Sequence, residues 1–186
     1  YFPFKSLWIR LDVDEALMLK NKKIAAGLNL LRIKTGLPVP FFLNAVKETK
    51  KLLSNYPDVP RIWFFRWFNC PNEFDECFGL HVTTPETFDK EYQIVRSKLG
   101  EFRYFTRHGF SKHASGRTWK TEEIQFFERK YNLKDLSDLP HFTVGKGNLA
   151  MLNLPNLNHI LLHPYLIQSH KEEFEKILNE ITKRNQ

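Results

Sequence analysis

Two short segments of the chain place a threonine two residues after a histidine, and these four polar side chains are the first candidates for chemistry. The segments are His81-Val82-Thr83 and His141-Phe142-Thr143. Successive side chains of a β-strand point to opposite faces, so in each segment the histidine and the threonine share one face. Two such strands lying side by side would gather two imidazoles and two hydroxyls around one spot.

Two histidines that face one phosphate group can act as general base and general acid at neutral pH. One imidazole takes a proton from the attacking hydroxyl or water, and the other gives a proton to the leaving oxygen. The threonine hydroxyls would donate hydrogen bonds to the non-bridging oxygens and stabilise the added charge. This chemistry needs no metal and no cofactor, and the predicted catalytic residues are His81, Thr83, His141 and Thr143.

The charge of the chain predicts an anionic partner. Lysine and arginine outnumber the acids 28 to 21, which gives a net charge of +7 and favours RNA, DNA or a phosphorylated small molecule. The segment from Arg103 to Lys120 contains no acid, and its glycines and serines are typical of a loop. We expect either a loop that binds phosphate or nucleic acid there, or a mobile surface loop. The predicted phosphate- or nucleic-acid-binding residues are Arg103, Arg107, Lys112, Arg117, Lys120 and Lys146.

The expected secondary structure mixes strands and helices without regular alternation. Hydrophobic patterns predict strands at residues 6–13, 61–68, 79–84, 102–106, 139–145 and 158–162. Helical spacing, caps and breakers predict helices at residues 14–36, 41–55, 85–99, 121–131 and from Ser169 onward. Such an order is typical of the α+β class, and a chain of 186 residues is expected to form a single globular domain over residues 1–186.

Cysteine content and hydropathy bear on the compartment. The two cysteines, Cys70 and Cys77, are too few for a disulfide framework, which favours the cytoplasm or another reducing intracellular compartment. No second pair of metal ligands with suitable spacing accompanies them, so we expect ordinary free thiols and no metal site. The chain has no run of about 18 apolar residues, and no membrane span is expected.

The paired motifs resemble those of the two-histidine (2H) phosphoesterase superfamily, whose signature is two His-hydrophobic-Thr/Ser-hydrophobic segments. His141-Phe142-Thr143-Val144 fits this pattern, whereas Thr84 replaces the last apolar residue after His81-Val82-Thr83. The segment from Leu7 to Asp12 is similar to the first strand of the family. The resemblance implies two α+β lobes flanking a central groove. It also implies a metal-independent phosphodiesterase that acts on RNA ends, cyclic phosphates or 2′-5′ linked nucleotides.

Two other functions stay open at this point. A non-catalytic RNA-binding or ribonucleoprotein subunit would use the basic helix faces, the segment 103–120 and the aromatic segment 61–68 to contact phosphates and bases. A metal-dependent nucleotidyl transferase or primase would use Asp12 and Asp14, which share a strand face and can hold divalent cations. Asp14 also suits the N-cap of a following helix.

Overall fold

The structure is a computed structural model that describes residues 6–14, 24, 27, 31, 44–108, 119–146, 152 and 157–185. The strands in this part of the chain are β1 Trp8–Val13, β2 Arg61–Phe65, β3 Phe78–Val82, β4 Tyr104–Arg107, β5 Lys134–Asp135, β6 His141–Thr143 and β7 His159–Leu162. The α-helices are α2 Asn44–Leu53, α3 Phe88–Leu99, α5 Thr121–Tyr131 and α6 Lys171–Asn185, with short 3-10 turns η2 Pro85–Thr87 and η4 Pro164–Leu166.

Contacts within the chain divide it into two compact units. The first unit comprises residues 1–62 and 140–186, and the second comprises residues 63–139. Strand β2 begins in the first unit and ends in the second. The expectation of one domain over residues 1–186 stays a prediction.

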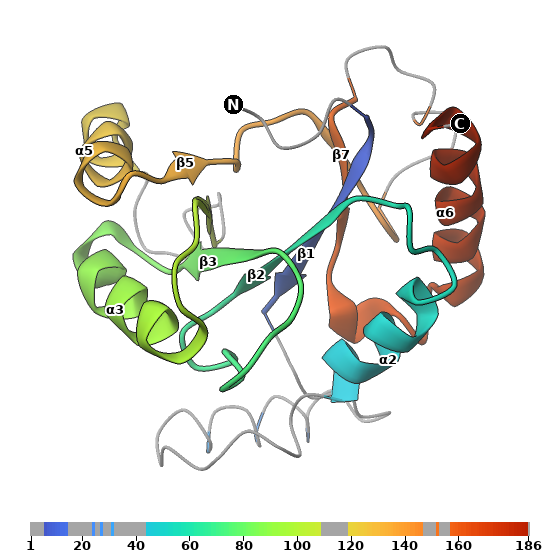
Figure 1. Cartoon of the computed structure of the whole chain (residues 1–186), viewed down its shortest axis with the longest axis horizontal. Helices are drawn as coiled ribbons and strands as arrows, with labels where there is room; N and C mark the ends of the chain where they lie inside the picture. Colours follow the sequence, from blue (N-terminus) through green and yellow to red (C-terminus); the bar gives the residue numbers. More distant parts are fainter. Residues whose placement is uncertain are drawn as a thin grey trace. The chain divides into compact units, whose positions relative to one another are not determined.

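The sheet of the first unit has the strand order β1-β7-β6, and both pairings are parallel. Its register sets Trp8 beside His159 and His159 beside His141. Helix α6 lies alongside β7 (Figure 1), and α2 contacts η4. The stripe that α6 buries has the spacing of one helix face and consists of Phe174, Ile177, Leu178 and Ile181.

The sheet of the second unit has the strand order β5-β4-β3-β2, again with parallel pairings throughout. Helix α3 packs on β3 and α5 packs on β5 (Figure 1). The ring of Phe88 on α3 stacks on Phe127 of α5 with centroids 4.0 Å apart, and it meets Phe105 of β4 edge-on at 5.1 Å. These rings join both helices and the sheet in one apolar layer.

The predicted mixture of helices and strands is confirmed, but the class is α/β and not α+β. Each strand pairing within the two units is parallel. The irregular order that suggested α+β arises partly because residues 66–77, which connect the parallel strands β2 and β3, contain no helix. Twelve residues are enough for such a crossover without one.

Most predicted elements agree with the structure, and two need correction. The aromatic strand ends at Phe65, three residues earlier than expected. The predicted loop 103–120 begins with strand β4, so its first part is sheet, while residues 109–118 lie outside the described part of the chain. The predicted helix 14–36 also falls mostly on residues that are not described.

The structure bears on the cysteines and on the expected absence of a membrane span. Cys70 is buried, Cys77 is exposed, and both are free thiols. Burial raises the pKa of Cys70 to about 12, against the opposing charge of Lys98, so this thiol stays protonated and unreactive. Within the described residues, no helix has both the length and the apolar character needed to cross a membrane.

The sheet of the second unit requires a glycine at position 79. A Cβ atom there would lie 2.4 Å from the carbonyl oxygen of Tyr104 and 2.7 Å from the ring of Phe64. The Tyr104 carbonyl is backbone and cannot rotate away, so we predict that Gly79→Ala lowers the free energy of unfolding by about 1–3 kcal/mol in urea titrations. Gly27→Ala is the control, because a Cβ there meets nothing within 4 Å. Equal urea midpoints for both variants would contradict this packing.

Candidate active site

His81 sits in the second unit on β3, where its side chain is only 2% exposed. Its register neighbour on β4 is Thr106, and neighbours across parallel strands share a face. The Nδ1 atom of His81 lies 2.7 Å from the hydroxyl oxygen of Thr106, which is fully buried. The motif histidine is therefore anchored by a cross-strand hydrogen bond.

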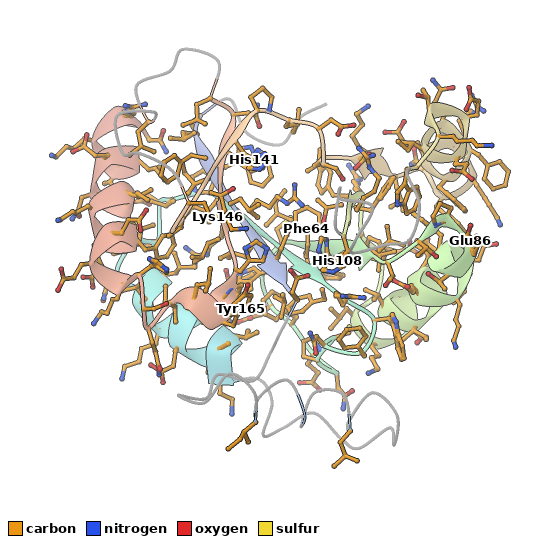
Figure 2. All side chains as sticks on the ribbon, turned by 180° about the vertical axis from the view of Figure 1, so that it is seen from behind. Phe64, Glu86, His108, His141, Lys146 and Tyr165 are labelled. Carbon is orange, nitrogen blue, oxygen red and sulfur yellow. The ribbon has the colours of Figure 1, made fainter. Side chains whose placement is uncertain are left out.

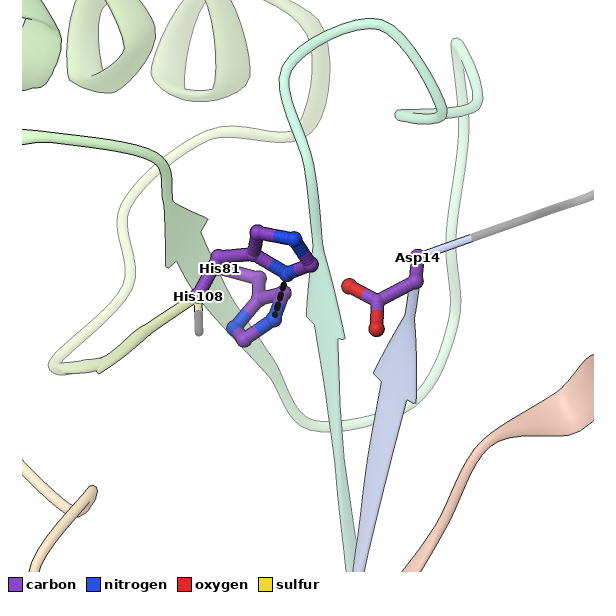
Figure 3. A group of neighbouring side chains, drawn as sticks. All are labelled: Asp14, His81 and His108. Carbon is purple, nitrogen blue, oxygen red and sulfur yellow. Dashed lines mark hydrogen bonds between the residues drawn. The ribbon is translucent and has the colours of Figure 1, made fainter. Parts of the chain in front are cut away.

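His108 completes this arrangement. It comes directly after the last residue of β4 and lies two residues beyond Thr106, which brings it to the same face. Its Nδ1 atom is 3.1 Å from Nε2 of His81 (Figure 3), and the two rings meet edge-on. Both nitrogens of buried His81 are engaged, so the half-exposed His108 is the more accessible imidazole of the two.

Thr83 lies just beyond the end of β3 and is held from two sides. Its backbone N–H donates to Glu91 at 3.1 Å, and its hydroxyl accepts a hydrogen bond from the guanidinium of Arg66 at 2.9 Å. Glu91 is 1% exposed and also accepts from the hydroxyl of Thr87 at 2.7 Å. The motif threonine thus occupies a fixed position at the carboxyl ends of β2 and β3.

Arg107 has a different environment from the one expected for a phosphate-binding residue. It is 7% exposed and forms ion pairs with Asp135, at 2.8 Å, and with Asp138. Burial raises the pKa of Asp135, while the charge of Arg107 and the hydrogen bonds from Ser137 act in the opposite direction. Arg107 therefore joins β4 to β5 and to the residues that come after β5, and its phosphate binding stays a prediction.

The other predicted phosphate-binding residues are only partly described. Arg103 precedes β4 and is exposed, and Lys120, also exposed, directly precedes α5. Lys112 and Arg117 lie outside the described residues. Their predicted function is not altered by the structure.

In the first unit, His141 belongs to a row of three rings that crosses the sheet. His141 on β6 stacks on His159 of β7 with centroids 5.1 Å apart, and His159 stacks on Trp8 of β1 at 4.7 Å. The register of the parallel strands aligns these three positions. His141 is half-exposed at the outer end of the row, because β6 is the edge strand.

His159 is the middle ring of this row and is fully buried. Neither of its ring nitrogens hydrogen bonds to a described residue. Burial, followed by the positive charges of Arg10 and His141, lowers the pKa of His159 to about 2. His159 is therefore a neutral ring at physiological pH and offers His141 an uncharged stacking surface.

The residues that come after His141 continue past the end of β6. Thr143 is half-exposed and shares the strand face of His141. Lys146 is exposed beyond a turn at Gly145, whose φ is +80° and whose N–H donates to Glu173 at 3.2 Å. His141 and Lys146 thus lie toward opposite ends of β6 (Figure 2). Lys146 is nearer to Thr143 along the strand than to the histidine.

The carboxylates of the metal-dependent alternative both have cationic partners. Asp12 accepts two hydrogen bonds from Arg10, at 2.8 and 2.6 Å, in a pair that is nearly completely buried. Asp14 lies 3.3 Å from Nε2 of His163, which comes directly after β7. These contacts give both acids a structural role, and their metal binding stays an untested alternative.

The structure therefore brings together His81, Thr106 and His108 in one unit, and His141, His159 and Trp8 in the other. The predicted pairing of His81 with His141 joins residues of different units and stays a prediction. Sequence reasoning missed His108 and His159. The two-residue spacing of Thr106 and His108 and the four-residue spacing of His159 and His163, each typical of one strand face, are the signals that could have found them.

Comparisons of the chain with protein-family models, with curated proteins and with solved structures found no match. The resemblance to the 2H phosphoesterases therefore depends on the motif residues alone. Any functional conclusion has to come from the geometry described above.

The buried ring of His159 makes the fold sensitive to acid. In the unfolded chain this histidine takes up a proton near pH 6.5, whereas in the folded chain it does so only near pH 2, so stability falls as pH drops below about 6.5. We predict that His159→Phe, which keeps a flat ring, loses less stability between pH 7 and pH 4.5 in urea titrations. The free energy of unfolding of this variant should also rise by about 1 kcal/mol at pH 7, because the substitution removes two buried nitrogens that no described residue hydrogen bonds.

The control for that prediction is His170→Gln, which removes a half-buried histidine that is paired with Glu173. Parallel stability–pH curves for the wild type and His159→Phe would show that His159 is not buried in its neutral form.

The surroundings of His163 predict a pH dependence of stability that is opposite to that of His159. Burial alone would lower its pKa, but the hydrogen bond to Asp14 and the charges of Asp12 and Asp14 outweigh this and raise it. The contact with Asp14 therefore stabilises the fold fully below about pH 6.5 and loses this effect as pH rises through the raised pKa.

We expect Asp14→Asn to cost about 1–2 kcal/mol at pH 5.5 and much less at pH 9, as measured by urea unfolding. Asp58→Asn, at an exposed acid of the same unit, should change neither value. A loss from Asp14→Asn that is constant with pH would rule out the pairing with protonated His163.

Proposed function

We propose that the chain is a metal-independent phosphodiesterase that acts on RNA ends, cyclic phosphates or 2′-5′ linked nucleotides, with histidine as the proton-transfer group. The observation that carries the proposal is the hydrogen-bonded series Thr106–His81–His108 at the carboxyl ends of β4 and β3. A buried histidine that orients a second, half-exposed histidine is the arrangement expected of a general base with a supporting residue.

The hydrogen bonds are compatible with a set of proton positions that suits a general base. When Nδ1–H of His81 donates to the Thr106 hydroxyl oxygen, Nε2 of His81 is an acceptor and receives Nδ1–H of His108. Nε2 of His108 then carries the lone pair that accepts a proton from the attacking water or hydroxyl. The leaving oxygen lies on the opposite side of the phosphorus and takes its proton from water, while the ring gives its own proton back to solvent, so the ring is neutral before and after the reaction.

Two further groups suit a phosphate ester at this edge of the sheet. The hydroxyl of Thr83 would donate to a non-bridging oxygen, and the guanidinium of Arg66, which contacts this hydroxyl, would offset its negative charge. The paired-motif form of the proposal adds His141 and Thr143 as the second histidine and threonine, with Lys146 as a phosphate contact. In that form two lobes would flank the substrate.

The test is turnover of adenosine 2′,3′-cyclic phosphate and of an RNA with a cyclic phosphate end, in EDTA. We expect His108→Ala and His81→Ala to lower kcat/KM by about 10²- to 10⁴-fold, because each removes the positioned proton acceptor or its support. His141→Ala should match them if the second motif takes part. His170→Ala is the control, since this histidine contacts Glu173 on α6.

Loss of all activity in EDTA would favour the metal-dependent alternative with Asp12 and Asp14. RNA binding by the wild type without turnover of either substrate would favour the non-catalytic RNA-binding subunit. Full activity of both His81→Ala and His108→Ala would refute the proposal.

A further inference from the structure

The aromatic run after β1 changes from core to surface at one residue. The side chains from Ile62 to Phe65 are fully buried, whereas the next three residues, Arg66, Trp67 and Phe68, are half-buried. Strand β2 ends at this point, so the three side chains lie at the carboxyl end of a parallel strand. Residues 62–65 of the aromatic segment 61–68 are therefore core, and residues 66–68 are partly exposed at the strand end.

Trp67 has the surroundings of a ring placed for stacking. It meets the ring of Phe68 edge-on, with centroids 5.3 Å apart, and the ammonium of Lys90 lies 5.6 Å from its ring centre. The guanidinium of Arg66 lies 4.6 Å from the ring centre of Phe68. Two aromatic rings with two cations at their faces can take up a planar base and the phosphate attached to its sugar.

The position of Trp67 in the sheet connects it to the histidine pair. Ligands of parallel α/β sheets bind outside the carboxyl ends of the strands. Trp67 comes after β2, Thr83 after β3 and His108 after β4, and these three strands are neighbours. The hydrogen bond from Arg66 to Thr83 ties the segment of Trp67 to the end of β3.

We propose that Trp67 stacks on the base of a nucleotide whose phosphate reaches Thr83 and His108. Cleavage of the phosphate ester in this inference rests on the proposed function. The inference adds that the substrate is a nucleotide whose base is recognised. If Trp67 only covered the core, its replacement would lower the stability of the fold. The replacement would then not change the affinity for a phosphate ligand that carries a base relative to one that lacks it.

The experiment compares adenosine 5′-monophosphate with ribose 5-phosphate, which has a hydroxyl in place of the base, by calorimetric titration of the full chain. We expect Trp67→Ala to weaken binding of adenosine 5′-monophosphate by about 5- to 150-fold and to leave ribose 5-phosphate unchanged. Trp67→Phe should retain most of the affinity, because it keeps a ring. Phe126→Ala is the matched control, since Phe126 is an exposed aromatic of α5 in the same unit.

Equal weakening of both ligands, unchanged binding of the nucleotide by Trp67→Ala, or no preference of the wild type for the nucleotide would overturn the inference. Binding that depends on Trp67 without cleavage of any ester would uphold the inference and refute the proposed phosphodiesterase. Cleavage of the cyclic phosphate with an unchanged KM in Trp67→Ala would refute the inference and leave the proposed function standing.

Discussion

Parallel strand pairing is the constraint on which the candidate site depends. In a parallel sheet the carboxyl ends of neighbouring strands meet at one edge, so polar residues that come after different strands gather there without any specific long-range signal. In the second unit this edge receives Arg66 from β2, Thr83 from β3 and His108 from β4. An antiparallel arrangement of the same strands would have sent alternate groups to opposite edges.

The register of the strands then decides which polar groups touch. His81 meets Thr106 because these residues are direct neighbours across β3 and β4, and His141 meets His159 for the same reason across β6 and β7. A shift of one residue would turn each histidine toward the opposite face, which is apolar. Gly79 supports the register of β3 and β4, since the Tyr104 carbonyl occupies the space of a side chain at that position.

Several polar groups buried on the sheet of the first unit are unfavourable for the stability of the fold. Arg10 and Asp12 satisfy one another through two hydrogen bonds, and such a pair contributes little net stability although breaking it costs about 3–5 kcal/mol. His159 leaves both ring nitrogens unpaired among the described residues, which is unfavourable by about 1–3 kcal/mol. A chain that keeps such a ring between Trp8 and His141 gains a rigid, uncharged contact for His141 from it.

The sequence predicted the local features well and the long-range ones poorly. Strands β6 and β7 and helices α2, α3 and α5 could be read from periodicity, caps and breakers, since these signals are local. Whether two strands pair in parallel depends on how the chain crosses over between them. The crossover from β2 to β3, residues 66–77, contains no helix, so nothing in the sequence indicated a parallel pairing there. His108 was assigned to a basic loop because β4 is only four residues long and its last residue, Arg107, is charged.

The two motif histidines also turn out to be chemically unequal, which no pattern of residue types could predict. His81 is buried and uses both ring nitrogens in contacts with Thr106 and His108, so it can orient a neighbour but is poorly placed to meet a substrate. His141 is half-exposed, and the contact that defines it is the face of its ring on His159. Identical His-x-Thr spacing thus gives an orienting residue in one unit and a half-exposed ring in the other. The proton-transfer role that the motif suggested for His81 fits the geometry of His108 better, because His108, unlike His81, combines a hydrogen-bonded Nδ1 with partial exposure at the edge where ligands of parallel sheets bind.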